Sequence, residues 1–135
     1  MKILIILTLI ANIAQALDLQ VKGLGADSDS GTYRCLLFKS EQGFPGDLKA
    51  AVQSDNGTVK DRTATCTFEN IEAGTYAVST FHDENDNQKL DTYFFGAPKE
   101  SYGFSNNASR PFSPPSFSEA AVTLTESQTI SINLK

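Results

Sequence analysis

The sequence predicts an all-β protein, an antiparallel β-sandwich of about seven strands with a long aromatic-rich ordered loop. Three observations indicate this class. Apolar and polar residues alternate with a period of two over several short segments, as half-buried strands require. Turn-forming residues separate these segments. No long segment has the 3.6-residue apolar spacing of an amphipathic helix.

The expected strands follow in order along the chain. In the first strand, Leu17, Leu19 and Val21 alternate with polar residues, and the second, 32–38, is apolar on both faces apart from Arg34. The remaining strands are predicted at 63–68, 75–82, 121–125 and 129–134, the last with Ile130, Ile132 and Leu134 inward. Each strand is short, which favours a sandwich over an α/β fold.

The segment between the second and third of these strands is ambiguous. Residues 47–53 fit either a short strand or a helical turn. Ser54-Asp55-Asn56-Gly57 is a strong turn signal, because Asn, Asp and Gly tolerate the backbone angles of tight turns.

The first sixteen residues have the pattern of a secretory signal peptide. Lys2 supplies a positive charge, 3–13 an apolar run and Ala14-Gln15-Ala16 a small-residue cleavage site. The run is too short to span a bilayer comfortably. We therefore expect an exported protein, periplasmic or secreted, with residues 17–135 as a single domain that does not insert into a membrane.

The charge balance restricts the partners. The chain carries 11 Lys and Arg against 16 Asp and Glu, a formal net charge of −5. Nucleic acid is excluded as an expected partner, because no basic stripe can neutralise phosphates.

Two cysteines, Cys35 and Cys66, both lie on predicted buried strand faces. Export exposes them to oxidising conditions, which favours a disulfide across the core. Two buried free thiols are the alternative.

Residues 92–118 interrupt the strand pattern and carry seven aromatic rings and four prolines. Disordered segments are poor in aromatic residues, so we expect an ordered loop against one end of the sandwich. Exposed aromatic rings also mark binding surfaces, and an extracellular module that binds a protein or glycan through this insert is an alternative function.

An acidic loop precedes the insert and is the clearest candidate site. Side-chain oxygens fall at Asp83, Asn85, Asn87 and Asp91, which are relative positions 1, 3, 5 and 9. With the backbone carbonyl of Lys89 at position 7, this is the ligand spacing of the first part of an EF-hand calcium loop. The spacing predicts a weak, structural calcium site.

The loop departs from an EF-hand in two places. Position 12 is Phe94, where an EF-hand has a bidentate Glu, and position 6 is Gln88, where it has Gly. A solvated Asp- and Asn-rich turn between two strands is therefore the alternative.

The central residues resemble a known family, bacterial exported proteins grouped as domain of unknown function 2141. The resemblance rests on the runs 81–91, 94–107, 114–117 and 119–120 and on the turn 71–78. It departs at Gln88, where the family usually has Gly. The family implies a sandwich fold but no activity. The Gly-Thr-Tyr turn at 74–76 is also similar to immunoglobulin-like or transthyretin-like sandwich modules.

We expect no enzymatic activity. His82 is the only histidine and lies on a predicted strand, and no nucleophile elbow or phosphate-binding glycine loop is present. Asp83, Asp91 and Glu100 are the carboxylates that a hydrolase would use, although the spacing of the first two fits a cation better.

Overall fold

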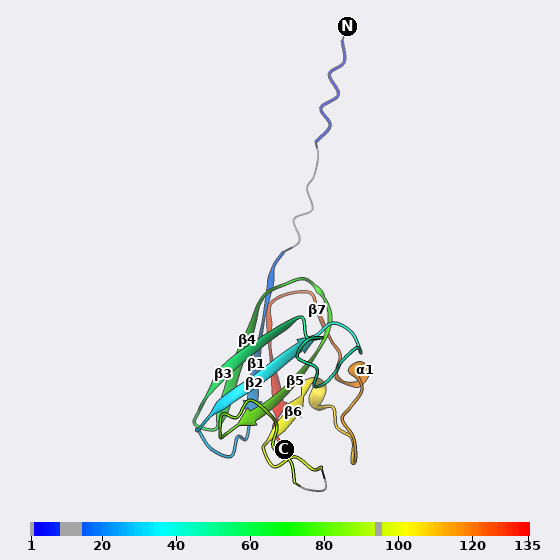
Figure 1. The fold of residues 1–135 in the computed structure, drawn as a ribbon. Helices are drawn as coiled ribbons and strands as arrows, with labels where there is room; N and C mark the ends of the chain where they lie inside the picture. Colours follow the sequence, from blue (N-terminus) through cyan, green and yellow to red (C-terminus); the bar gives the residue numbers. More distant parts are fainter. Residues whose placement is uncertain (1, 9–14, 94–95) are drawn as a thin grey trace.

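The computed structural model describes residues 2–8, 15–93 and 96–135, and these form an all-β structure with very little helix (Figure 1). The predicted targeting segment 1–16 and the insert residues Phe94 and Phe95 therefore lie partly or wholly outside the described residues. The strands are β1 (Leu17–Leu24), β2 (Thr32–Phe38), β3 (Gln53–Lys60), β4 (Thr63–Ile71), β5 (Gly74–Asp83), β6 (Tyr102–Phe104), β7 (Val122–Leu124) and β8 (Gln128–Asn133).

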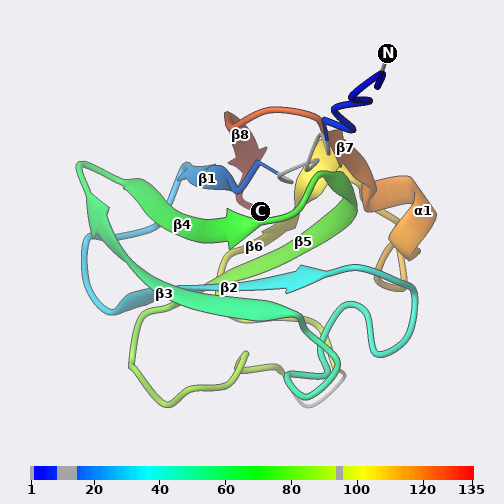
Figure 2. The same cartoon turned by 90° about the horizontal axis from the view of Figure 1, so that it is seen from above.

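Seven of the eight strands form one continuous path in the order β6-β5-β2-β3-β4-β1-β8, and the remaining strand, β7, pairs with the start of β5. Neighbours are antiparallel except β1 and β8, which run parallel. At the two ends of this path, Tyr102 and Lys135 exchange backbone hydrogen bonds of 3.2 and 2.9 Å. The sheet thereby curls into a nearly closed barrel, with β1, β4 and β8 on one side and β2 and β3 on the other (Figure 2).

This architecture refines the predicted class. The all-β prediction is confirmed, but an immunoglobulin-like or transthyretin-like sandwich is not, because β3 joins both halves of the sheet and Tyr102 bonds Lys135 across the seam. Among the described residues, no helix combines the length and the apolar character that crossing a membrane requires.

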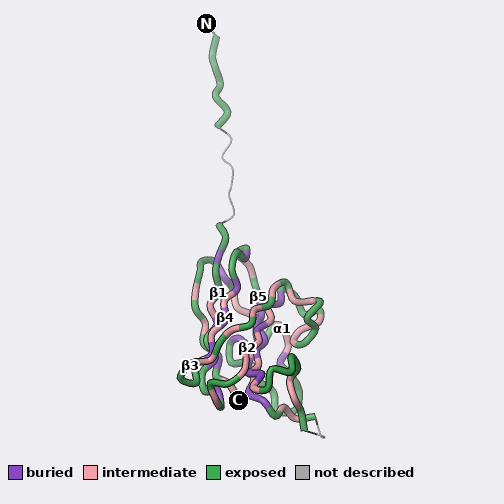
Figure 3. The backbone as a smooth tube through the Cα atoms, turned by 60° about the vertical axis from the view of Figure 1, so that its left-hand side comes forward, coloured by how far each residue is buried: buried purple, intermediate pink, exposed green. Residues whose placement is uncertain are grey.

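The core lies inside the barrel and comes from the alternating positions of the strands (Figure 3). Leu19 and Val21 of β1, Leu37 of β2 and Phe68 of β4 are fully buried. Burying each of these side chains stabilises the fold by about 1.5–3 kcal/mol. The predicted inward faces of the first, second and third expected strands are thus confirmed.

Cys35 of β2 and Cys66 of β4 form a disulfide, with Cα atoms 6.7 Å apart. The two strands are not neighbours in the sheet, since β3 lies between them. The bridge therefore crosses the interior, as the shared buried faces predicted.

The turn predicted at 54–57 is wrong, because these residues lie in the middle of β3. Three of them have a tertiary partner that a turn signal does not reveal. Asp55 accepts a hydrogen bond from the backbone of Thr67, and Asn56 accepts one from Arg34. Gly57 is required because a Cβ there would lie 1.8 Å from the Thr65 carbonyl oxygen.

The reversal instead occurs at Asp61 and Arg62, which both have positive φ, 52° and 60°. Asp29 stabilises this hairpin turn, since its carboxylate accepts the backbone N–H groups of Asp61 and Arg62 at 2.9 and 2.7 Å. These two hydrogen bonds hold the pKa of Asp29 below its usual value.

The insert is ordered where the structure describes it, but it is not a single loop. It contains β6, a 3-10 turn η1 (Ser105–Asn107) and the start of a short helix α1 (Phe117–Ala120). Phe104 and Phe117 pack on Phe44, with ring centroids 6.1 Å apart in each pair, and Phe44 also meets Phe38. The described part of the insert therefore joins the sheet through β6 and packs on Phe44 through aromatic contacts, whereas the sequence predicted a loop against one end of a sandwich.

Candidate cation-binding loop

The acidic loop follows β5 at the end of the barrel near the C-terminus (Figure 1). Residues 84–91 connect β5 to the insert. The connection between β1 and β2 packs against the start of the loop, because a Cβ on Gly31 would lie only 2.1 Å from the Asp83 carbonyl oxygen. Close packing at Gly31 fixes where the loop leaves the sheet.

Asp83, the first predicted ligand, is fully buried at the end of β5. Its Oδ1 accepts the backbone N–H of Asn87 at 3.2 Å, and its Oδ2 accepts the backbone N–H of Gln88 at 2.8 Å. These bonds curl the chain back over the Asp83 carboxylate. Such a tight curl is what a hard cation requires of a loop that supplies several oxygens.

Gln88 occupies the position where the calcium-loop pattern expects glycine. Its φ is +68°, so it adopts the left-handed conformation that the turn needs, at a cost of roughly 1 kcal/mol relative to glycine. Asp86 is also left-handed, with φ +53°. The substitution of Gln for Gly therefore preserves the turn.

Three further predicted ligands come together. Asn85 Nδ2 donates to Asp91 Oδ2, and Asn87 Nδ2 donates to Asp91 Oδ1, both at 2.6 Å. These two hydrogen bonds, with that from Asn87 the larger cause, hold the pKa of Asp91 below its ordinary value. Lys89 lies between Asn87 and Asp91 in the sequence, and its backbone N–H donates to Asn87 Oδ1 at 3.1 Å.

Two residues that the ligand pattern did not include complete the loop. Arg34 Nε donates to Asp83 Oδ2 at 2.6 Å, and its Nη2 lies 3.8 Å from Asp86 Oδ1. A single charge in the otherwise apolar strand 32–38 was the sequence signal for this role. Because Arg34 neutralises Asp83 and attracts Asp86, it reduces the charge available to a cation.

Glu100 is the second such residue. Although it lies in the insert, its carboxylate is buried and accepts the backbone N–H of Glu84 at 2.8 Å and that of Asp91 at 3.0 Å. Glu100 therefore ties together the two ends of the loop. The sequence offered only a lone acidic residue among aromatic ones as a signal for it.

His82 is buried beside the loop and is the penultimate residue of β5, directly before Asp83. Its Nε2 hydrogen-bonds the Ser30 carbonyl oxygen at 2.5 Å, while its Nδ1 lies 3.8 Å from Glu84 Oε1. The ring thus packs the β1–β2 connection against β5.

Within the described part of the chain, no three His, Cys, Asp or Glu side chains gather in a group suited to a metal ion. The predicted ligand set includes only two such side chains, Asp83 and Asp91, because Asn85, Asn87 and the Lys89 carbonyl are neutral oxygen donors. Oxygen donors of this kind suit calcium or magnesium rather than zinc.

Comparison with protein-family models gives one match. A model described as "Uncharacterized protein conserved in bacteria (DUF2141)" matches residues 20–132. The chain belongs to this family. The match confirms the resemblance seen in the sequence. The matched range includes all of the acidic loop, residues 83–91. No curated protein and no solved structure matches this DUF2141 protein.

Proposed function

We propose that this DUF2141 protein is an exported, non-enzymatic β-domain whose loop 83–91 binds one calcium ion for structural stability. The observation that carries the proposal is the meeting of Asn85 and Asn87 with the Asp91 carboxylate, each at 2.6 Å. Rotating the two amides would present their oxygens to a cation beside Asp91, at the expense of the hydrogen bonds that these oxygens now accept from the backbone N–H groups of Asn87 and Lys89.

The remaining donors suit this arrangement. Asp83 has Oδ2 committed to Arg34 and Gln88, whereas Oδ1 has only the longer bond to Asn87. Oδ1 and the Lys89 carbonyl would complete the ligand set. Because Asp83 and Asp91 are the only charged ligands and Arg34 offsets Asp83, we expect a dissociation constant on the order of 10⁻⁴–10⁻³ M.

Export is part of the proposal. The targeting pattern at 1–16 and the Cys35–Cys66 disulfide both support it, since such bridges persist in oxidising compartments. Millimolar calcium outside the cell would load a site of this affinity.

The test is a calcium titration of the chelator-treated protein. Calorimetry measures the heat of binding, and thermal denaturation measures the change in melting temperature. We expect binding heat and a rise of roughly 3–8 °C at calcium about tenfold above the dissociation constant. Asp91→Asn should abolish most of the rise. Glu126→Gln, an exposed carboxylate in the β7–β8 turn, should retain it. Absence of both heat and stabilisation in the wild type would reject the proposal.

One observation favours a second function, an interaction module that binds a protein or glycan through the insert 92–118. Phe112 is fully exposed, although its segment is held by the Arg110–Glu119 ion pair and by a capping box at Ser116. Phe104 and Phe117 do not favour this function, because they pack on Phe44. Phe112→Ser should abolish capture of a partner without changing the melting temperature.

A further inference from the structure

The predicted cleavage point of the targeting segment lies directly against the folded barrel. Cleavage after Ala16 would make Leu17 the first residue of the mature chain, and Leu17 is also the first residue of β1. Ala16 is exposed, whereas Leu17 is only 2% exposed and belongs to the hydrophobic core. The predicted scissile bond is therefore joined to the core without an intervening linker.

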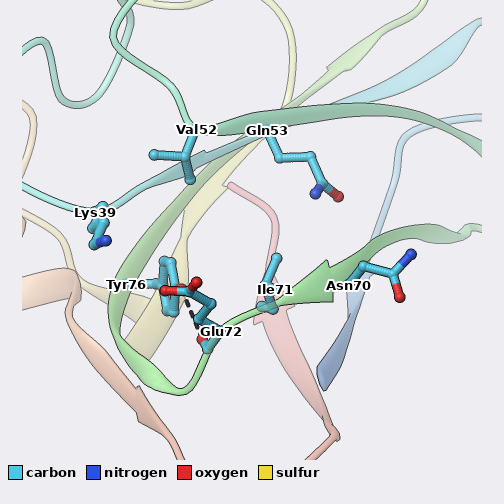
Figure 4. A pocket seen from close by; sticks show the side chains of 7 residues that line it. All are labelled: Lys39, Val52, Gln53, Asn70, Ile71, Glu72 and Tyr76. Atoms are coloured by element: carbon cyan, nitrogen blue, oxygen red, sulfur yellow. Dashed lines mark hydrogen bonds between the residues drawn. The ribbon is translucent and has the colours of Figure 1, made fainter. Parts of the chain in front are cut away.

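Contacts on two sides hold the start of β1 in place. Leu17 pairs with Ile71 at the end of β4, and Asp18 Oδ1 accepts the backbone N–H of Asn70 at 3.1 Å. Figure 4 shows Asn70 and Ile71 at this end of β4, where both border a hollow of about 210 Å³. Toward β8, the Asp18 backbone N–H donates to Ser127 Oγ at 2.9 Å. The two residues that follow the scissile bond are thus fixed in the folded barrel.

The strand that begins at Leu17 lies inside the sheet, not at its edge. β1 runs between β4 and β8, and β8 is the last strand of the chain. The pairing of β1 with β8 can therefore form only when the whole chain is available. Until then, one side of β1 has no partner, and the bond between Ala16 and Leu17 is open to an enzyme.

We infer that proteolytic removal of the targeting segment must precede closure of the barrel. The inference rests on the proposed export of the protein. A protease cleaves a folded segment only after that segment opens locally. In the reaction, water adds across the peptide bond, so that Ala16 keeps a carboxylate on the released segment and Leu17 gains the α-amino group of the mature chain. A barrel that closes with residues 1–16 still attached is a poor substrate.

The test is cell-free synthesis of the full chain under oxidising conditions, with purified signal peptidase in detergent added either during synthesis or after folding. We expect cleavage during synthesis. Cleavage after folding should be at least about a hundredfold slower, since only the small, locally opened fraction of the protein is then a substrate. Resistance of residues 17–135 to trypsin shows that the barrel has formed.

A matched variant separates burial of the bond from recognition of the targeting segment. Inserting Leu-Asp-Gly-Ser-Gly-Ser between Ala16 and Leu17 keeps the two residues after the scissile bond but moves the bond away from β1. This variant should be cleaved equally fast before and after folding.

A local change should loosen the start of β1 without moving the bond. Ser127→Ala removes the acceptor of the Asp18 N–H, so cleavage of the folded chain should speed up by about two- to tenfold. Ser131→Ala, at an exposed position of β8, should be cleaved as slowly as the folded wild type.

Equally fast cleavage of the folded wild type and the folded insertion variant would overturn the inference and leave export intact. A folded insertion variant that resists cleavage would also overturn it, because burial of Leu17 would then not be the obstacle. Absence of cleavage of the wild type even during synthesis would instead refute the proposed export, and the inference with it.

Discussion

The Asp83 carboxylate is fully buried, and its partner Arg34 has only 18% of its side chain exposed. A buried carboxylate is costly unless its oxygens are hydrogen-bonded and its charge is paired. Arg34 and the backbone N–H groups of Asn87 and Gln88 meet both needs. The interaction therefore both stabilises β2 against β5 and shapes the loop.

Removing the positive charge of Arg34 should strongly destabilise the folded protein. Arg34→Gln leaves the buried Asp83 carboxylate without its cation, so we expect the free energy of unfolding to fall by about 3 kcal/mol. Urea denaturation at neutral pH measures the change. Arg62→Gln is the control, because Arg62 contributes its backbone N–H to Asp29, and it should change stability by less than about 0.5 kcal/mol. Equal losses in the two variants would contradict this account of Arg34.

The lowered pKa of Asp91 predicts a pH dependence in the calcium-free protein. The amides of Asn87 and Asn85 favour the ionised carboxylate in the folded state, and Lys89 and Lys99 add to this. A depressed folded pKa stabilises the fold above the unfolded value of about 3.9, and the contribution disappears as pH falls toward the folded value. Melting temperatures in chelator from neutral to acidic pH should fall less steeply for Asp91→Asn than for the wild type. Glu126→Gln should keep the wild-type slope. A steeper slope in Asp91→Asn than in the wild type would contradict this contribution of Asp91 to stability.

Among the strands, β3 is unusual in its burial and in its polar side chains. It contains no buried residue, and its half-buried positions alternate with exposed ones. Its polar side chains bond neighbouring strands: Gln53 and Asp55 bond β4, and Asn56 accepts from Arg34 of β2. Gly57 marks the point where β3 passes from pairing with β2 to pairing with β4.

Gly57→Ala should therefore cost more than an ordinary strand substitution. The added Cβ would meet the Thr65 carbonyl oxygen at 1.8 Å, and the backbone must shift to relieve the overlap. We expect a loss of about 2–3 kcal/mol in the free energy of unfolding, measured by urea denaturation. Gly46→Ala is the matched control, because nothing lies within 4 Å of its added Cβ. A Gly57→Ala protein as stable as this control would refute the close approach.

In the whole molecule, two features close the barrel. The seam between Tyr102 and Lys135 joins the ends of the sheet, and the Cys35–Cys66 bridge ties β2 to β4 through the interior. The bridge spans 31 positions of sequence, a loop long enough for cross-linking to reduce the entropy of the unfolded chain appreciably.

Reduction of this bridge should lower the free energy of unfolding by roughly 3–4 kcal/mol. Urea denaturation with and without reductant measures it, and a thiol assay confirms that both cysteines are free. In the Cys35→Ser, Cys66→Ser double variant, reductant should have no effect. An unchanged midpoint in fully reduced wild-type protein would show that the bridge adds nothing to stability.

Part of the site could be predicted from local spacing, and part could not. Asp83, Asn85, Asn87 and Asp91 were grouped as candidate ligands because their spacing pattern lies within nine consecutive residues. Arg34 and Glu100 were not assigned to the loop, because their contacts with it join segments far apart in the chain. Likewise, the signal at Asp55-Asn56-Gly57 predicted a turn, since nothing local indicates Thr65, Thr67 or Arg34 as partners.

The sequence by itself determined the all-β class, the inward faces of most strands and the curl of the acidic loop. These depend on side-chain alternation and on residue types a few positions apart. Only the tertiary structure decided that the sheet closes as a barrel and that β3 bridges its two halves. It also decided that an arginine and a glutamate brace the loop. Each of these depends on which distant backbone groups meet, and a linear pattern of apolar and polar residues does not encode that.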